Sequence, residues 1–98
     1  MKAVLMHTAG GPDVLSVEEI DPQAPGPGES VVGIKAIGVN YTDIYTRSGV
    51  NQPPNLPWVP GLEGAGVVLA NGSGVTEVAV GDLVAFTGVV RSYAEQVV

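Results

Sequence analysis

The sequence predicts a mainly β protein, a small, partly closed antiparallel barrel with one short helix. Short apolar runs of strand length are separated by turn signals, and the chain contains 14 glycines and 8 prolines. The chain does not show the regular alternation of strands and helices that is found in parallel sheets. With 98 residues, 45% of them hydrophobic and 14% charged, the chain has the size and composition of one compact domain.

The N-terminal third predicts a hairpin followed by a loop. Lys2–Met6 is a short apolar run, residues 10–13 form a glycine and proline turn signal, and residues 14–20 read as a second strand. Residues 21–28 hold three prolines and two glycines. Because proline lacks the N–H that a strand ladder needs, this segment is expected to be a loop.

A third strand is expected at residues 30–40, where Val32, Ile34 and Ala36 would share one face. Gly33 and Gly38 interrupt the alternation. Glycines inside a strand pattern indicate bends or a close approach of two backbones.

A helix of about two turns is expected at Tyr41–Ser48, which lacks strand alternation. Asn40 is a good N-cap residue, and Asp43 lies in the first turn, where a negative charge suits the helix dipole. Arg47 falls in the last turn, and Gly49 can take the left-handed conformation that ends a helix.

The second half predicts a loop and three more strands. Residues 50–60 carry four prolines around Trp58, which either lies at the rim of a cleft or is a hydrophobic plug. Strands are expected at residues 63–70, 83–87 and 93–98, and turns are expected at residues 71–74 and 81–82. Tyr93 is expected to pack in the core or at a sheet edge.

Charge and cysteine content exclude several function classes. The formal net charge is −6, and the four basic residues are scattered, so binding to nucleic acid or to an anionic membrane is not expected. The absence of cysteine excludes disulfides and thiolate metal sites, and it fits a reducing, cytoplasmic location. No run approaches the roughly 20 apolar residues of a membrane span, and the N-terminal apolar run is too short for a signal peptide.

Five stretches in register carry a family resemblance: AGGPDVL, GVNYTDIYTRSG, PGLEGAGVV, GSGV and GDLVAF. Together they resemble the N-terminal catalytic domain of zinc-independent quinone oxidoreductases, in the medium-chain dehydrogenase/reductase superfamily. Each stretch alone is a weak signal, but the five cover nearly the whole chain. The resemblance implies that residues 1–98 are a GroES-like catalytic-domain fragment. It also implies, for the full-length family, NADPH-dependent reduction of quinones or related α,β-unsaturated carbonyls.

No metal site is expected. Zinc-dependent members of that superfamily carry a cysteine where this chain has Asn40 and a histidine where it has Leu62, and neither substitute suits a tetrahedral zinc site. Glu63 alone does not make a site. Hydride transfer without a metal must rely on positioning and on hydrogen-bond donors that face the developing oxyanion.

The resemblance implies roles for three residues near the predicted helix. Asn40 would bind the cofactor near its nicotinamide end. Tyr45 would line the cleft and contact cofactor or substrate carbonyl, and Thr42 falls where zinc-dependent relatives place a proton-relay hydroxyl. Structural readings stand beside these roles: Asn40 as helix cap, Thr42 and Asp43 as first-turn residues, and Tyr45 as half-buried packing. The cap and site roles of Asn40 are compatible. A role in the site is favoured for Tyr45, and a structural role is favoured for Thr42 and Asp43.

Two further polar residues are expected to be structural. His7 is the one side chain that titrates near neutrality unperturbed, but a lone histidine at a strand end is more often a surface or packing residue than a base. Glu63 is expected to be a buried ion-pair partner of Arg47 or Lys35 rather than a general base.

Family members continue beyond the SYAEQVV position into a Rossmann dinucleotide-binding domain, which is absent from these 98 residues. The chain alone is therefore expected to bind NADPH very weakly and to lack appreciable activity. The alternative is a stand-alone GroES-like binding or assembly module, which could form a homo-oligomer through exposed edge strands. The sequence does not identify the quinone or other small carbonyl substrate. It also leaves open whether NADPH or NADH is the cofactor.

Overall fold

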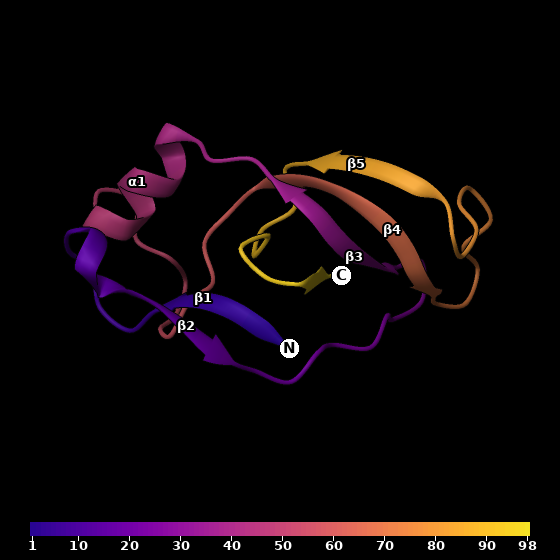
Figure 1. Ribbon diagram of the computed structural model, residues 1–98, viewed down its shortest axis with the longest axis horizontal. Helices are drawn as coiled ribbons and strands as arrows, with labels where there is room; N and C mark the ends of the chain where they lie inside the picture. Colours follow the sequence, from indigo (N-terminus) through magenta and orange to yellow (C-terminus); the bar gives the residue numbers. More distant parts are fainter.

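The computed structural model describes residues 1–98, which form two antiparallel sheets and one α-helix. The smaller sheet pairs β1 (Lys2–Met6) with β2 (Leu15–Glu19). The larger sheet has the order β5-β4-β3-β6, with bounds Leu83–Thr87, Glu63–Asn71, Ser30–Ile37 and Gln96–Val97. The predicted mainly β architecture is confirmed, and because the two sheets do not join into one ladder, the barrel is only partly closed (Figure 1).

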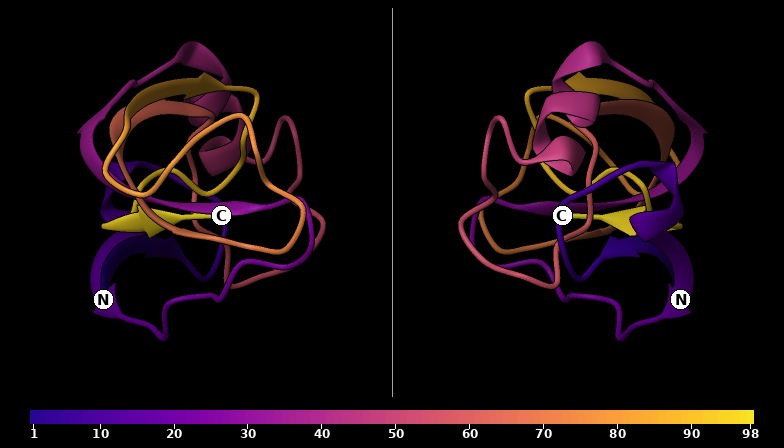
Figure 2. Two further views of the ribbon diagram at one scale, coloured as in Figure 1. Left: turned by 90° about the vertical axis from the view of Figure 1, so that its right-hand side faces the viewer. Right: turned by 90° about the vertical axis from the view of Figure 1, so that its left-hand side faces the viewer.

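The helix and the sheets are spread along the long axis of the molecule. Helix α1 (Tyr41–Ser48) lies at one end, the β4–β5 connection lies at the other, and the strands run between them (Figure 1). Viewed along that axis, strands and loops encircle the centre of the molecule (Figure 2). Two isolated bridges, Ala3 with Ala94 and Met6 with Trp58, tie β1 to the second half of the chain.

Two irregularities curve the β3–β4 ladder. Its register shifts between Val31 and Val32 and again between Ile34 and Ala36. Val31 is the buried residue of β3, whereas Val32 and Ile34 are half-buried and Ala36 is exposed. A bulge re-aims the side chains that follow it, so simple alternation does not hold along this strand.

The expected close backbone approach is confirmed in the same ladder. A Cβ built on Gly66, in β4, would lie 2.0 Å from the Gly33 carbonyl oxygen.

Several strand bounds differ from the expectation. The second strand starts at Leu15 because Pro12–Val14 forms a 3-10 turn with proline at its start. Strand β3 ends at Ile37, where the Gly38 N–H makes the last bond to the Glu63 carbonyl.

The expected C-terminal strand at 93–98 is reduced to β6, because the residues before it bond to several segments. The Tyr93 N–H donates to the Pro60 carbonyl, its carbonyl accepts from Val4, and the Glu95 N–H donates to Lys2. Backbone groups distributed in this way cannot form one continuous ladder.

Helix α1 begins and ends where its sequence signals predict. Asn40 is the N-cap residue and forms a capping box with Asp43, and Gly49 ends the helix at φ 92°. Its single buried residue is Asp43. No helix of the structure is long and apolar enough to cross a membrane.

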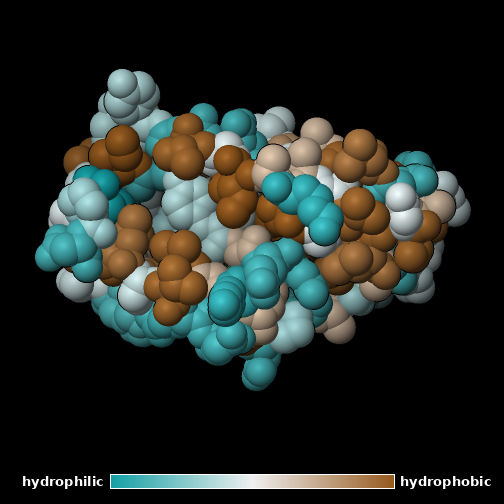
Figure 3. Space-filling view, viewed as in Figure 1, coloured by the Kyte–Doolittle hydropathy of each residue, from teal (hydrophilic) through white to brown (hydrophobic).

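The hydrophobic core is small. It centres on Ala3, Leu5, Val59 and Ala94, and 13 of the 98 residues are buried. Large apolar side chains consequently reach the surface, and Figure 3 shows them on the face that it presents. Tyr41 and Leu83 are among the most exposed, at 78% and 79%.

Candidate functional site

A pocket of about 200 Å³ lies between helix α1 and the loop that leads into β4. Its polar walls carry uncharged side chains, Thr42 and Thr46 from the helix and Asn51 and Gln52 from the loop. The remaining walls are mainly apolar, from Trp58, Leu62, Val90 and three prolines. Asp43 is the one charged residue of the lining, so the pocket offers no cation to a phosphate group.

Thr42 belongs to this pocket, and Asn40 lies next to it in the chain. Asn40 stands in extended conformation at the N-cap, two residues before Thr42, and it is half-buried. Thr42 is half-buried as well, and its backbone carbonyl accepts a hydrogen bond from the Thr46 hydroxyl at 3.1 Å. Thr42 and Thr46 are four residues apart, which places both on the pocket face of the helix.

Tyr45 lies outside the lining of this pocket. Its side chain is 46% exposed, and it shares a helix face with Tyr41, four residues earlier. The structure therefore brings Thr42 and Asn40 close together and presents Tyr45 on an adjacent face of the same helix.

The carboxylate of Asp43 is buried and accepts two hydrogen bonds. Its Oδ2 atom accepts the Asn40 backbone N–H at 3.0 Å and the Tyr93 hydroxyl at 2.8 Å. Burial first, then the hydrogen bond and charge of Asp43, raise the pKa of Tyr93 far above that of an ordinary phenol. Tyr93 therefore stays protonated and donates to Asp43 at any physiological pH. The expected structural role of Asp43 is confirmed.

Trp58 is a half-buried wall of the pocket, which agrees with the first of its two expected positions, at the rim of a cleft. Its backbone is paired with Met6, with both N–H to O distances at 2.9 Å. The Arg91 guanidinium carbon lies 5.9 Å from the centre of its ring, within cation–π range. The backbone of Trp58 is thus fixed by its hydrogen bonds to Met6, and its ring is contacted by the Arg91 guanidinium.

The expected ion pair of Glu63 is wrong. The two ion pairs of the structure join the N-terminus to Glu19 and His7 to Glu18. Arg47 instead donates from Nε to the Gly10 carbonyl at 3.2 Å. The Glu63 side chain lies over Gly38, and a Cβ at Gly38 would collide with it, so the absence of a side chain at Gly38 makes room for Glu63.

The residues around α1 do not fit a metal ion. No group of three or more histidine, cysteine, aspartate or glutamate side chains converges anywhere in the structure.

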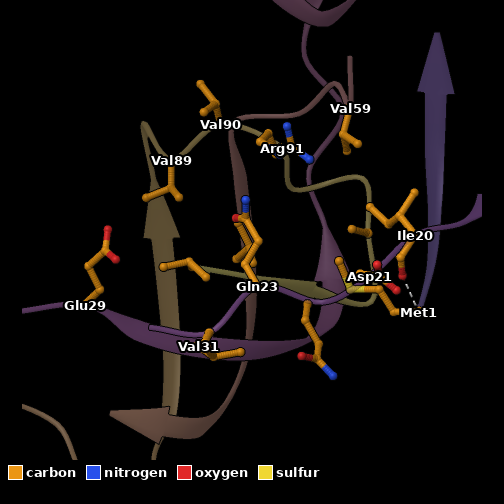
Figure 4. Close-up of a pocket in the computed structure, with 15 residues that line it drawn as sticks. Met1, Ile20, Asp21, Gln23, Glu29, Val31, Val59, Val89, Val90 and Arg91 are labelled. Atoms are coloured by element: carbon orange, nitrogen blue, oxygen red, sulfur yellow. Dashed lines mark hydrogen bonds between the residues drawn. The ribbon is translucent and has the colours of Figure 1, made fainter. Parts of the chain in front are cut away.

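A larger cavity lies elsewhere in the molecule. It has a volume of about 560 Å³ and is walled by the chain start, the loop after β2, β3 and residues 89–98. Figure 4 shows Ile20, Val31 and Val59 around it. None of Asn40, Thr42 and Tyr45 lines this cavity.

Sequence reasoning missed the polar loop residues of the pocket and the role of Tyr93. Asn51 and Gln52 sit in an irregular loop, where no periodicity reports which side chains turn inward. Asp43 and Tyr93 are 50 residues apart in the chain. No spacing rule connects two residues at that separation.

Comparison with known proteins gives a consistent result. Residues 26–97 match the family model of the alcohol dehydrogenase GroES-like domain. A quinone oxidoreductase of Pseudomonas aeruginosa is 46% identical over 95 residues, which is 96% of this chain and 29% of that protein.

Solved structures agree with the sequence match. A quinone oxidoreductase of Pseudomonas syringae superposes with a TM-score of 0.94 at 47% identity, over 97% of this chain and 30% of that one. Escherichia coli quinone oxidoreductase in complex with NADPH gives a TM-score of 0.92 at 38% identity, over 99% of this chain and 31% of that one. The chain thus spans less than a third of the length of these relatives. It belongs to the alcohol dehydrogenase GroES-like domain family, and it corresponds to the N-terminal catalytic domain of quinone oxidoreductases in the medium-chain dehydrogenase/reductase superfamily.

Proposed function

We propose that this chain supplies the substrate-binding, catalytic part of an NADPH-dependent quinone reductase. The observation that carries the proposal is the pocket beside α1, whose walls join neutral hydrogen-bonding groups to flat apolar ones and contain no cation. Such a lining suits a planar, uncharged carbonyl compound better than a phosphate or a carboxylate. The similarity to quinone oxidoreductases supports the same substrate class.

When NADPH is bound, it supplies the hydride that reduces the carbonyl compound, and the residues of this chain orient and stabilise the substrate. The backbone of Asn40 is fixed at the N-cap by the bond from its N–H to Asp43, and its side-chain NH2 group can donate to a carboxamide or carbonyl oxygen. Thr42 lines the pocket, and its hydroxyl can donate to the oxygen on which negative charge develops. Tyr45 would contact the cofactor or the substrate from the adjacent helix face.

We infer that this chemistry is zinc-independent and that the nucleotide-binding domain lies outside these residues. Every strand pair of the structure is antiparallel, and α1 is its single α-helix, so no βαβ unit is available to bind a dinucleotide. The chain alone should therefore bind NADPH very weakly and show no appreciable reductase activity. A cytoplasmic setting agrees with the absence of cysteine.

The test is a chimaera in which these 98 residues replace the matching segment of Escherichia coli quinone oxidoreductase. We expect NADPH oxidation that depends on an added quinone. Thr42→Val should lower kcat about 10²-fold or more, the scale of losing one oxyanion donor. Asn40→Ala should lower kcat/KM, and Tyr45→Phe should lower it more than Tyr41→Phe. Fast NADPH oxidation by the 98-residue chain itself, abolished by Asn40→Ala, would contradict the proposal.

A second candidate function is a stand-alone binding or assembly module. Strand β5 is an edge strand, and its Leu83 is 79% exposed, as is Val80 before it at 63%. Exposed edges with apolar side chains can pair with a second copy. Light scattering on the purified chain separates the two: a closed oligomer at micromolar concentration favours the module, and a monomer favours the enzyme fragment.

A further inference from the structure

Tyr93 touches both walls of the pocket beside α1 without lining it. On the helix side, its hydroxyl donates to Asp43 Oδ2 at 2.8 Å, and the same oxygen accepts the Asn40 N–H at 3.0 Å. Asp43 is 6% exposed, so water does not compete freely for this oxygen. The Tyr93 hydroxyl is therefore one of two donors that fix the first turn of α1.

On the opposite wall, the Tyr93 ring lies against Gly61. A Cβ built on Gly61 would stand 2.6 Å from Tyr93 Cδ1. The Tyr93 N–H also donates to the Pro60 carbonyl at 3.0 Å. Leu62, the next residue after Gly61, is a wall of the pocket.

Tyr93 is itself anchored to the core. Its backbone carbonyl accepts from the Val4 N–H of β1 at 2.8 Å, and its ring packs on the buried cluster around Ala3 and Val59. The ring is rigid, so the separation between Asp43 on the helix and Gly61 on the loop is set by the length of one side chain.

We propose that Tyr93 is a positioning residue that sets the width of this pocket and thereby the ring size of the carbonyl substrate it accepts. The proposal rests on the proposed function, because the substrate class is taken from there. The high pKa of the phenol agrees with it, since the link does not break in the neutral range.

Hydrogen exchange on the 98-residue chain tests the link without any substrate. Tyr93→Phe keeps the ring on Gly61 and removes the hydroxyl. A hydrogen bond to a charged group contributes enough that its loss should speed exchange of the Asn40 amide about tenfold or more. The Val68 amide, which donates to Asp82 in the distant β4–β5 region, should be unchanged. Equal acceleration of both amides, or of neither, would overturn the proposal.

Quinone binding tests the consequence for the pocket. Trp58 is the single tryptophan of the chain and a pocket wall, so quenching of its fluorescence reports occupancy. The probes are 1,4-naphthoquinone and the single-ring tetramethyl-1,4-benzoquinone. Tyr93→Phe should change the ratio of the two dissociation constants at least threefold, whereas Tyr41→Phe, an exposed tyrosine on α1, should not. Saturable quenching with an unchanged ratio in Tyr93→Phe would refute the role in specificity.

Asp43→Asn provides the conservative rescue. Both hydrogen bonds use the same carboxylate oxygen, and an asparagine offers one oxygen at that place. This variant should keep the wild-type ratio of the two dissociation constants, and exchange of the Asn40 amide should stay slower than in Tyr93→Phe. A ratio of dissociation constants like that of Tyr93→Phe would overturn the geometric account. If the wild-type chain shows no quenching by either quinone, the proposed substrate class is wrong, and hydrogen exchange alone decides whether Tyr93 holds the two walls.

Discussion

Gly61 is the position where one added methyl group should disturb the site most. It has φ 105°, a conformation that L side chains rarely adopt, and it is fully enclosed. A Cβ there would lie 2.2 Å from Ser92 Oγ, 2.6 Å from Tyr93 Cδ1 and 3.0 Å from the Tyr93 backbone nitrogen. Gly74 is a matched control, because it has φ 80° and nothing within 4 Å of its Cβ position.

The two variants share a backbone term and differ in a packing term. A non-glycine residue at a sparsely populated φ costs about 1–3 kcal/mol, and alanine returns about 0.4–1 kcal/mol by restricting the unfolded chain. Overpacking at Gly61 adds about 1–3 kcal/mol. From the midpoints, Gly61→Ala should destabilise by about 3 kcal/mol and Gly74→Ala by about 1 kcal/mol, against a total stability of about 5–15 kcal/mol for a chain of this size.

The assay is urea unfolding of the chain, followed by circular dichroism, for wild type and both variants. We expect the midpoint to fall in the order wild type, Gly74→Ala, Gly61→Ala, with similar slopes. Loss of cooperative unfolding in Gly61→Ala alone would agree with the same account. The reasoning is refuted if the free energies of unfolding of the two variants agree within about 0.5 kcal/mol, because the overlap term would then be absent.

Two further predictions concern side-chain groups outside the pocket. Hydrogen bonds from Ser16 and then His7 lower the pKa of Glu18 below 4.5. The contribution of Glu18 to stability is therefore present above that pH and is lost as the pH falls through the lowered pKa. In an NMR titration, Ser16→Ala should raise the pKa of Glu18, and an unchanged pKa would contradict the assignment. The Ser92 hydroxyl is fully buried without a partner, so Ser92→Ala should leave the free energy of unfolding unchanged or raise it by up to about 1 kcal/mol, and a loss of that size in urea unfolding would count against the unpaired state.

The sequence predicted those parts of the fold that are encoded locally. Helix α1 was placed correctly because its signals, Asn40 before it and Gly49 after it, act within one turn of the helix. The burial of Val31 could not be read from the sequence because a bulge depends on how β3 pairs with β4, and two segments far apart in the chain carry no local mark of their register.

The candidate site was predictable only in part, for the same reason. The helix residues Asn40 and Thr42 could be named from their motif, and Trp58 could be named as one of two alternatives. The contribution of Leu62 to the opposite wall and the bond between Asp43 and Tyr93 arise from tertiary contact. The ion pair of Glu63 failed because opposite charges in a sequence do not specify which pairs meet. Arg47 found a backbone carbonyl instead.

Helix α1 is held to the rest of the molecule mainly by directional polar bonds, and this suits a site. Its one buried residue is charged, so hydrophobic burial contributes little to its placement. At its first turn Asp43 is bonded to Tyr93, and at its last turn Arg47 donates from Nε to the Gly10 carbonyl while its own carbonyl accepts the Gly10 N–H at 2.9 Å. An apolar face can slide with small loss, whereas a hydrogen bond weakens steeply with misalignment. Because the small core supplies little rigidity at this end of the molecule, polar links at both ends of the helix are what keep Asn40 and Thr42 at a defined position.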